Sequence, residues 1–171
     1  MFEPFECELN SDIATFFNHK AVEYEKSFRS RTFIIYNLHT NKNNKNDILA
    51  YYTLSLKSVK IPSDSIPKRI AGKLGGKKRL ENEIPAFLIG QLGKNSNAKD
   101  NIPGKDLLEE AMSMIFVAQE CVGCRLVILE CEEKPKLINF YKANGFLYLQ
   151  NQKERSNDLA QMIKVVETQS V

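Results

Sequence analysis

A glycine and two lysines lie where a polar loop leads into a long predicted helix. Lys99 lies in the loop, and Gly104-Lys105 comes directly before the helix predicted from Asp106 to Val122. The first N–H groups of a helix have no partner within it, and the helix dipole adds partial positive charge, so such a helix start can bind an anion. Gly104 has no side chain and lets a ligand approach the backbone. The sequence therefore predicts an anion site here, although an ordinary capped helix has the same pattern.

The cysteines offer a second kind of chemistry, and the chain has four of them: Cys7, Cys121, Cys124 and Cys131. Cys121-Val-Gly-Cys124 has C-x-x-C spacing, but a zinc site needs two more ligands, and both histidines lie far upstream. A thioredoxin-like motif would follow a strand and open a helix, whereas this one follows a helix. Cys131 has no histidine near it in sequence and is expected in the core. The cysteines are interpreted as reduced thiols, with no metal site.

Positive charge is concentrated in one segment, Lys57 to Arg79. This segment holds eight basic side chains against a single acid, Asp64, whereas the net charge of the whole chain is only +3. A local excess of this kind can serve as a contact surface for nucleic acid, and a solvated lysine-rich loop is its more common explanation. Both interpretations stay open at this point.

These residues must be positioned by helices and strands that the hydrophobic pattern predicts. Ser11-Asp12 is a capping signal for a helix that carries apolar residues as far as Tyr24, and a short helix is expected around Ile66 to Leu74. Further helices are predicted at Asp106–Val122 and Lys134–Ala143. Strands are predicted at Arg31–Tyr36, Ile48–Val59, Ile84–Leu92, Arg125–Cys131, Phe146–Leu149 and Leu159–Val166.

The order of these elements predicts an α/β (α+β) fold. The first two strands are expected to form an antiparallel hairpin, and a polar loop is expected from Gly93 to Asn101. The passage from Ile84 to Cys131 is strand, helix, strand, which predicts a right-handed parallel crossover. A chain of 171 residues, of which 43% are hydrophobic and 26% charged, fits a single domain over residues 1–171.

The expected location is the cytoplasm. The chain opens with Met1-Phe2-Glu3-Pro4, which lacks the basic and apolar start of a secretion signal. No apolar run approaches the roughly 20 residues needed to cross a bilayer, so no membrane partner is expected.

The segment from Leu137 to Phe146, LINFYKANGF, resembles the F-Y-x-x-x-G-F signature of the GNAT superfamily of acetyltransferases. It follows the predicted anion site after one helix and one strand, as in that family. The resemblance implies a mixed, mostly antiparallel sheet of six to seven strands, flanked by helices, whose central parallel pair splays to admit coenzyme A. It also implies that Tyr141 is the general acid that protonates the departing CoA thiolate.

In the GNAT superfamily a six-residue motif grips the pyrophosphate of CoA. Its counterpart here is the stretch KDNIPG from Lys99 to Gly104. Lys99 replaces the usual Arg or Gln, Ile102 stands where a glycine is expected, and Pro103 removes an N–H donor. The resemblance implies that acetyl-CoA is held by Leu92, Gly93, Lys94, Lys99, Asp100, Asn101, Ile102, Gly104, Lys105 and Asn139, with no metal.

The N-terminal half resembles the toxin-type members of the superfamily in particular, which acetylate the amino acid of a charged tRNA. Three of their segments have counterparts here: Phe5-Glu6-Cys7, Ser30-Arg31-Thr32-Phe33 and Ala50-Tyr51-Tyr52-Thr53-Leu54-Ser55. Two more are Ile84-Pro85 and the stretch LIGQL from Leu88 to Leu92, in which Gln91 replaces their Arg. For this group the segment Lys57–Arg79 is a candidate tRNA contact.

The expected function is therefore transfer of an acetyl group from acetyl-CoA to a primary amine by direct attack, without a covalent intermediate. The acceptor is left open between a small molecule, a peptide and an aminoacyl-tRNA, and a homodimer is left open as an assembly. No general base is evident, since Glu130 and Glu132 are as readily explained as solvated carboxylates at a strand end. The alternative is a non-catalytic or weakly active module of the same fold that binds CoA or nucleic acid, for which Ile102 and Pro103 are the best argument.

Overall fold

The computed structural model describes residues 4–37, 47–62, 64–98, 101–149 and 159–167. The contacts within the chain divide it into two compact units, residues 1–55 with 89–115 and residues 56–88 with 116–171. Each unit is described separately below. The prediction of a single domain over residues 1–171 stays a prediction.

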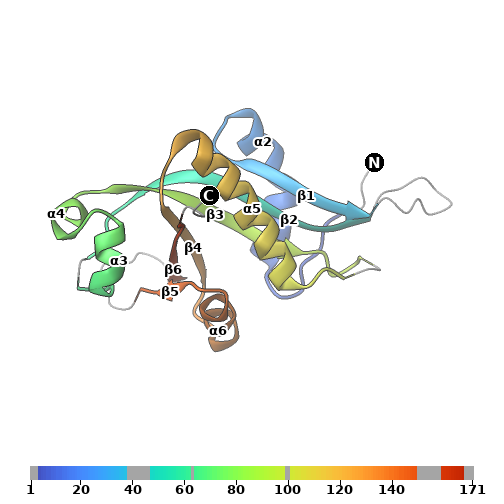
Figure 1. Ribbon diagram of the computed structural model, residues 1–171. Coiled ribbons are helices and arrows are strands. Elements are labelled where there is room, and N and C mark those ends of the chain that lie inside the picture. The colour runs from blue at the N-terminus through green and yellow to red at the C-terminus, as the bar shows by residue number, and fades with distance from the viewer. Residues whose placement is uncertain (1–3, 38–46, 63, 99–100, 150–158, 168–171) are drawn as a thin grey trace. The chain divides into compact units, whose positions relative to one another are not determined.

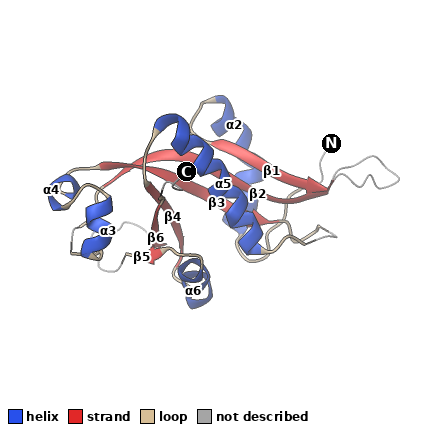
Figure 2. Ribbon diagram, in the orientation of Figure 1, coloured by secondary structure: helices blue, strands red, loops and turns tan. Residues whose placement is uncertain are grey.

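The sheet has the predicted mixed character. It has six strands in the order β1-β2-β3-β4-β6-β5, with β3 and β4 as a central parallel pair. Figure 1 labels the elements in chain order, and Figure 2 distinguishes strands from helices. β2 (Asp47–Val59) and β3 (Ile84–Lys94) each run through both units.

The first unit is built on the antiparallel pair of β1 (Arg31–Asn37) and β2, which confirms the predicted hairpin. A bulge interrupts their register between Ile35 and Tyr36. Two short helices, α1 (Ser11–His19) and α2 (Ala21–Lys26), precede the pair, so the single helix predicted from Ser11 to Tyr24 is wrong. The cap of α1 is Asn10, whose side chain accepts a hydrogen bond from the Asp12 N–H, one position before the predicted Ser11.

The core of the first unit is aromatic. Phe5, Phe17 and Tyr51 pack with ring centroids 4.7 to 5.0 Å apart. Phe5 and Tyr51 are almost completely buried, and Ile48 packs with them. Phe5 is thus part of the core although it lies near the start of the chain.

The second unit contains β4 (Leu126–Glu132), β6 (Leu159–Val165) and β5 (Leu147–Tyr148), paired antiparallel in that order. It also contains the helices α3 (Lys68–Lys73), α4 (Lys77–Leu80) and α6 (Pro135–Ala143). The helix predicted around Ile66 to Leu74 corresponds to α3, and α4 is a further helix that follows Gly75 and Gly76, which both take positive φ. The core consists of apolar residues from these strands, from α3 and α4, and from the adjacent parts of β2 and β3.

The helix at the predicted anion site and the helix that carries Tyr141 begin and end near their predicted bounds. α5 spans Gly104–Val122, two residues longer at its start than predicted. α6 has Pro135 in its first turn, and Gly145 follows its end with φ of 83°. Within the described residues, no helix combines the length and the apolar character required to span a membrane.

Candidate functional site

The loop after β3 is held by the N-terminal segment of the chain. The Asn95 side chain accepts a hydrogen bond from the Glu6 N–H at 3.2 Å and donates one to the Ile48 carbonyl at 2.9 Å. The Ser96 N–H donates to the Glu6 carbonyl at 2.8 Å, and the Ser96 hydroxyl accepts from the Glu8 N–H at 3.0 Å. Three of these bonds join the first residues of the unit to the loop that follows β3, and the bond to Ile48 joins this loop to β2. The loop therefore starts from a fixed position.

Gly93 lies at a point of close packing in β3, which continues to Lys94 rather than ending at Leu92 as predicted. A Cβ placed on Gly93 would lie 2.2 Å from Cγ2 of Ile13 in α1. Only glycine fits this position without a shift, because such an approach is far inside van der Waals contact. The predicted exposure of backbone groups at Leu92, Gly93 and Lys94 depends on the end of β3, and the splay of the central strand pair stays a prediction.

The start of α5 keeps part of the predicted positive charge. The Lys94 ammonium donates a hydrogen bond to the Asn101 side-chain oxygen at 3.0 Å, which bridges the loop. Lys105 pairs with Glu109 one turn later in the helix at 3.5 Å, and both side chains are exposed. Asp106 adds a negative charge to the first turn. Lys99 and Asp100 lie outside the described residues, and Ile102 is half-buried.

Tyr141 in α6 is buried, and its ring packs edge to face against Phe140 and Phe146 at 5.1 and 5.7 Å between centroids. Burial, with a smaller effect of Cys131, raises its pKa well above the usual value of a phenol. The hydroxyl has no hydrogen-bond partner among the described residues. A buried phenol that stays protonated at neutral pH and has no internal partner is suited to donate to a ligand.

The other polar residues near α6 differ in their availability. Asn139 is exposed on the helix. Glu130 accepts hydrogen bonds from Lys57 at 2.8 Å and from Gln161 at 3.4 Å, and Glu132 pairs with Lys134 at 2.6 Å. Both carboxylates are therefore engaged, which gives neither of them the environment of a general base.

The cysteines are free thiols, as predicted. Burial, followed by the nearby Glu132 and Glu133, raises the pKa of Cys131 to about 11. This thiol is protonated at neutral pH, which disfavours a covalent acyl-cysteine route. In the parts of the chain that the structure covers, no group of His, Cys, Asp and Glu is placed to hold a metal ion.

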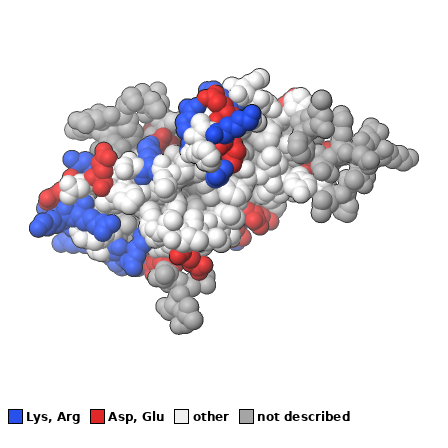
Figure 3. Space-filling model, turned by 90° about the horizontal axis from the view of Figure 1, so that it is seen from above, with Lys and Arg blue, Asp and Glu red and all other residues white. Residues whose placement is uncertain are grey.

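The segment Lys57–Arg79 forms a basic surface around α3 and α4, where Figure 3 shows Lys and Arg gathered. Two of its eight basic residues are engaged: Lys57 pairs with Glu130, and Lys73 pairs with Glu167. The other six form no ion pair with any described residue, and they are Lys60, Lys68, Arg69, Lys77, Lys78 and Arg79. The segment is therefore available to an anionic partner over most of its length.

Two features of the site were missed from the sequence. The role of Asn95 as an anchor for the N-terminal segment depends on contacts about 90 residues apart, which no local pattern shows. The packing of Gly93 against Ile13 was also missed. A glycine inside an otherwise apolar strand is a signal of close approach, and it was available at Gly93.

Comparison with protein-family models and with the sequences of curated proteins gives no match. Solved structures, by contrast, match over nearly the whole chain. The toxin AtaT in complex with acetyl-methionyl-tRNAfMet is 20% identical, with a TM-score of 0.70 over 94% of this chain and 86% of that one. A tyrosine-to-phenylalanine mutant of KacT is 17% identical, with a TM-score of 0.73 over 96% of this chain and 88% of that one.

A third match is an AtaT mutant, also tyrosine to phenylalanine, bound to acetyl-CoA and to the C-terminus of the antitoxin AtaR. It is 18% identical, with a TM-score of 0.67 over 96% of this chain and 86% of that one. These likenesses, together with the strand order and the central parallel pair, confirm the fold class predicted from the sequence. The chain has the GNAT-like fold of the AtaT and KacT toxins.

Proposed function

We propose that this chain is an acetyl-CoA-dependent N-acetyltransferase of the toxin type, and that its acceptor is the free amino group of an aminoacyl-tRNA. The observation that carries the proposal is the likeness to AtaT over 94% of the chain, because AtaT has been solved with an acetylated aminoacyl-tRNA. AtaT has also been solved with acetyl-CoA. The N-terminal segments that resemble toxin-type enzymes support the same acceptor.

In the proposed reaction the neutral amine attacks the thioester carbonyl, a C–N bond forms and the C–S bond breaks. The leaving thiolate needs a proton, and the Tyr141 hydroxyl supplies it. The raised pKa keeps this phenol protonated at neutral pH, and the phenolate left after the transfer regains its proton from solvent. The absence of an internal partner leaves the hydroxyl free to turn toward the sulfur. The proton lost by the amine passes to solvent, since Glu130 and Glu132 are both paired.

Acetyl-CoA is held in this proposal by backbone groups more than by side chains. Leu92, Gly93 and Lys94 supply N–H and C=O groups to the pantetheine arm, and the first turn of α5 supplies N–H groups to the pyrophosphate. Gly104 opens α5 and leaves room for the phosphates. Lys99, Asp100, Asn101, Ile102, Lys105 and Asn139 complete the proposed set.

The basic surface of Lys57–Arg79 is the proposed contact for the tRNA backbone. Six basic side chains there have no ion pair with a described residue, and each phosphate contact that forms releases a counterion. Binding of the charged tRNA should therefore weaken steeply as salt is raised. With four free cysteines the proposed location is the cytoplasm, and a homodimer is the proposed assembly.

The test has two stages. Acetyl-CoA at a hundred times its dissociation constant should stabilise the protein by roughly 2.7 kcal/mol, which a thermal-shift measurement detects. A panel of charged tRNAs, free amino acids and peptides is then incubated with labelled acetyl-CoA, and label in the acid-precipitable tRNA fraction is counted. Label that enters peptides or small amines but no charged tRNA would contradict the proposed acceptor.

A non-catalytic binding module is the second candidate, and Ile102 and Pro103 favour it. Ile102 is half-buried where the family has a glycine, and Pro103 offers no N–H to a phosphate. Absence of any thermal shift at millimolar acetyl-CoA, with salt-dependent binding of RNA retained, would select this candidate.

A further inference from the structure

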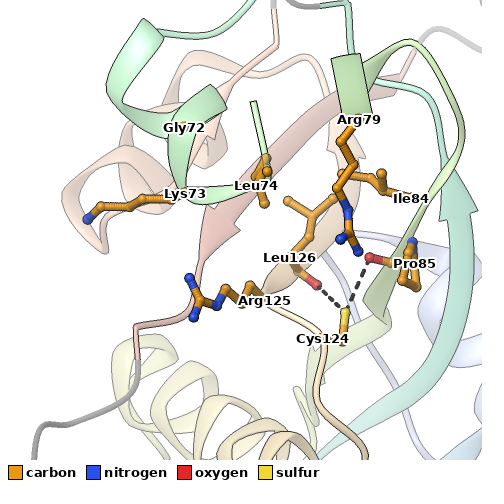
Figure 4. A pocket seen from close by; sticks show the side chains of 10 residues that line it. Gly72, Lys73, Leu74, Arg79, Ile84, Pro85, Cys124, Arg125 and Leu126 are labelled. Atoms are coloured by element: carbon orange, nitrogen blue, oxygen red, sulfur yellow. Dashed lines mark hydrogen bonds between the residues drawn. The ribbon is translucent and has the colours of Figure 1, made fainter. Parts of the chain in front are cut away.

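The second unit contains a pocket that has not been assigned to acetyl-CoA. Its volume is about 470 Å³, and its walls come from the α3–α4 segment, the start of β3 and the start of β4. None of the residues proposed to bind acetyl-CoA lines it. The lining residues are shown in Figure 4: Gly72, Lys73, Leu74, Gly75, Arg79, Ile84, Pro85, Cys124, Arg125 and Leu126. The volume lies within the usual range for pockets that hold small organic ligands.

Two guanidinium groups give the pocket its charge. Figure 4 shows Arg79 extending from α4 toward Pro85 and Cys124, with Arg125 on another side of the pocket. Neither arginine pairs with a carboxylate of any residue that the structure describes. Lys73 differs, because it pairs with Glu167 and its side chain points away from the pocket. Arg79 and Arg125 are therefore the two cations available to a ligand.

The backbone between α3 and α4 is shaped around the Arg79 side chain. Gly75 has φ of 102°, and a Cβ placed on it would lie 2.4 Å from Cδ of Arg79. The aliphatic part of the arginine thus occupies the space that any other residue at position 75 would fill. This packing restricts the side chain before a ligand arrives, so less conformational entropy is lost on binding.

The remaining side chains offer little surface to a ligand. Leu74, Ile84 and Leu126 are almost completely buried, and Pro85 lies beside them at the start of β3. The Cys124 thiol donates to the Pro85 carbonyl at 3.2 Å, which occupies one polar group of the wall. The two arginines therefore dominate the accessible chemistry of the pocket, and they suit a ligand that has an anionic end.

We infer that this pocket binds a phosphate monoester, with Arg79 and Arg125 on the phosphate. Guanidinium groups bind phosphate oxygens with paired, charge-assisted hydrogen bonds, which favours phosphate over an isolated carboxylate. The monoester has two sources with the same chemistry, a free nucleotide or the phosphorylated 5′ end of an RNA. The inference does not depend on acetyl-CoA binding, and of its two arginines only Arg79 belongs to the proposed tRNA contact.

The experiment is a calorimetric titration at low salt with four probes: AMP, adenosine, and one 12-nucleotide RNA with and without a 5′-phosphate. AMP is expected to bind and adenosine is not. Arg79→Gln and Arg125→Gln should each weaken AMP about tenfold, as loss of one charge-assisted hydrogen bond predicts. The matched control is Lys78→Gln, which removes the same charge from the adjacent residue outside the pocket and should change the affinity less than twofold.

The RNA probes distinguish the two sources. A 5′-phosphorylated RNA that binds at least tenfold more tightly than the unphosphorylated RNA, with the gain lost in Arg79→Gln, identifies an RNA end as the ligand. Equal binding of both RNAs, with AMP binding retained, identifies a free nucleotide. Failure of AMP and of the phosphorylated RNA to bind the wild-type protein, or equal weakening by Lys78→Gln, overturns the inference. The acetyl-CoA thermal shift in Arg79→Gln should match that of the wild type, which separates this result from the test of the transferase.

Discussion

Each unit of the molecule buries a tyrosine among aromatic rings, and the two tyrosines differ in the hydrogen bonding of their hydroxyl groups. Tyr51 packs against Phe5 and Phe17, and Tyr141 packs against Phe140 and Phe146. Burial raises the pKa of both. The Tyr51 hydroxyl donates to the Ile13 carbonyl at 2.6 Å, whereas the Tyr141 hydroxyl has no partner among the described residues.

The difference separates a structural tyrosine from a functional candidate. A buried hydroxyl costs free energy unless it is hydrogen-bonded, so most buried hydroxyls in folded proteins have a partner. Tyr51 follows this rule and joins α1 to β2. The Tyr141 oxygen is not among the fully buried unpaired side-chain atoms of the described residues, which are those of Ser30 and Thr32, so solvent or a ligand can reach it. We therefore expect the Tyr51 hydroxyl to contribute to stability and the Tyr141 hydroxyl to contribute to turnover.

The largest expected effect is on catalysis. Tyr141→Phe should lower the rate of acetyl transfer by about 10²-fold or more, because general acid catalysis by a positioned side chain contributes on this scale. Stability and the acetyl-CoA thermal shift should change little, since the hydroxyl has no internal partner to lose. The measurement is single-turnover transfer of labelled acetyl groups, with Tyr51→Phe as the matched control at equal folded concentration. An equal loss of rate in Tyr51→Phe and Tyr141→Phe would contradict a role in turnover for the Tyr141 hydroxyl alone.

The next effect concerns Ile13, which touches both Tyr51 and Gly93. Gly93→Ala places a Cβ against the Ile13 side chain and should destabilise the protein by about 1–3 kcal/mol, as overpacking does. The displaced Ile13 also carries the carbonyl that Tyr51 uses. In double-mutant cycles Gly93→Ala should therefore couple to Tyr51→Phe by more than about 0.5 kcal/mol and be additive with Tyr141→Phe.

Urea unfolding of the single and double variants measures this coupling. Ile13→Ala supplies the control, because it removes the side chain that clashes, so the Gly93→Ala, Ile13→Ala pair should lose less stability than the sum of the two changes. Additivity of Gly93→Ala with Tyr51→Phe would show that Ile13 does not connect the two positions.

A smaller effect is expected for the structural tyrosine itself. Tyr51→Phe removes one buried hydrogen bond and should lower the free energy of unfolding by about 1 kcal/mol. Tyr141→Phe should leave this free energy within about 0.5 kcal/mol of the wild type, since no bond is lost. Chemical denaturation at pH 7 compares the two, and a larger loss for Tyr141→Phe would reverse their assigned roles.

The smallest effect tests what the tyrosines share. Unfolded tyrosine has a pKa of about 10, and burial raises the pKa of both residues in the folded state. Above pH 10 the unfolded chain releases a proton that the folded chain keeps. The stabilisation is therefore complete below pH 10 and is lost as the pH rises through the folded-state pKa. Each tyrosine should cost the wild type about 0.8 kcal/mol at pH 10.5 relative to its Phe variant.

Denaturant titrations of the wild type and both variants at pH 8 and pH 10.5 give these differences. Similar values for Tyr51→Phe and Tyr141→Phe would support equal burial of the two rings. A difference for Tyr51→Phe alone would mean that the Tyr141 phenol titrates as it does in water, and its assignment as a protected acid would fail.

The fold was predicted well from the sequence because its elements carry strong local signals. The apolar run in β3, the apolar stripe of α5, and Pro135 and Gly145 around α6 each depend on neighbouring residues alone. The errors lie where a local signal was weak. One helix was predicted across Lys20, where α1 ends and α2 begins, and the short helix α4, after the Gly75-Gly76 pair, was not predicted.

The candidate site was predictable in part. Tyr141 was singled out from a motif. That its hydroxyl has no hydrogen-bond partner among the described residues depends on the packing around it and is visible only in the structure. The assignment of Glu130 as a solvated carboxylate missed its pairing with Lys57, 73 residues earlier in the chain. Long-range polar contacts have no periodicity, so sequence patterns do not reveal them. The pocket around Arg79 and Arg125 joins segments that are equally distant in sequence.

The hydrogen bonds between the N-terminal segment and the loop after β3 have a consequence for behaviour on heating. Chain ends are among the first parts of a protein to open locally, at temperatures where its sheets remain intact. Detachment of Glu6 and Glu8 would release Ser96, whereas Asn95 would keep its hydrogen bonds to the Ile48 and Leu49 carbonyls. Heat inactivation would then begin below the melting temperature and reverse on cooling, since only the terminal segment has to return to its place.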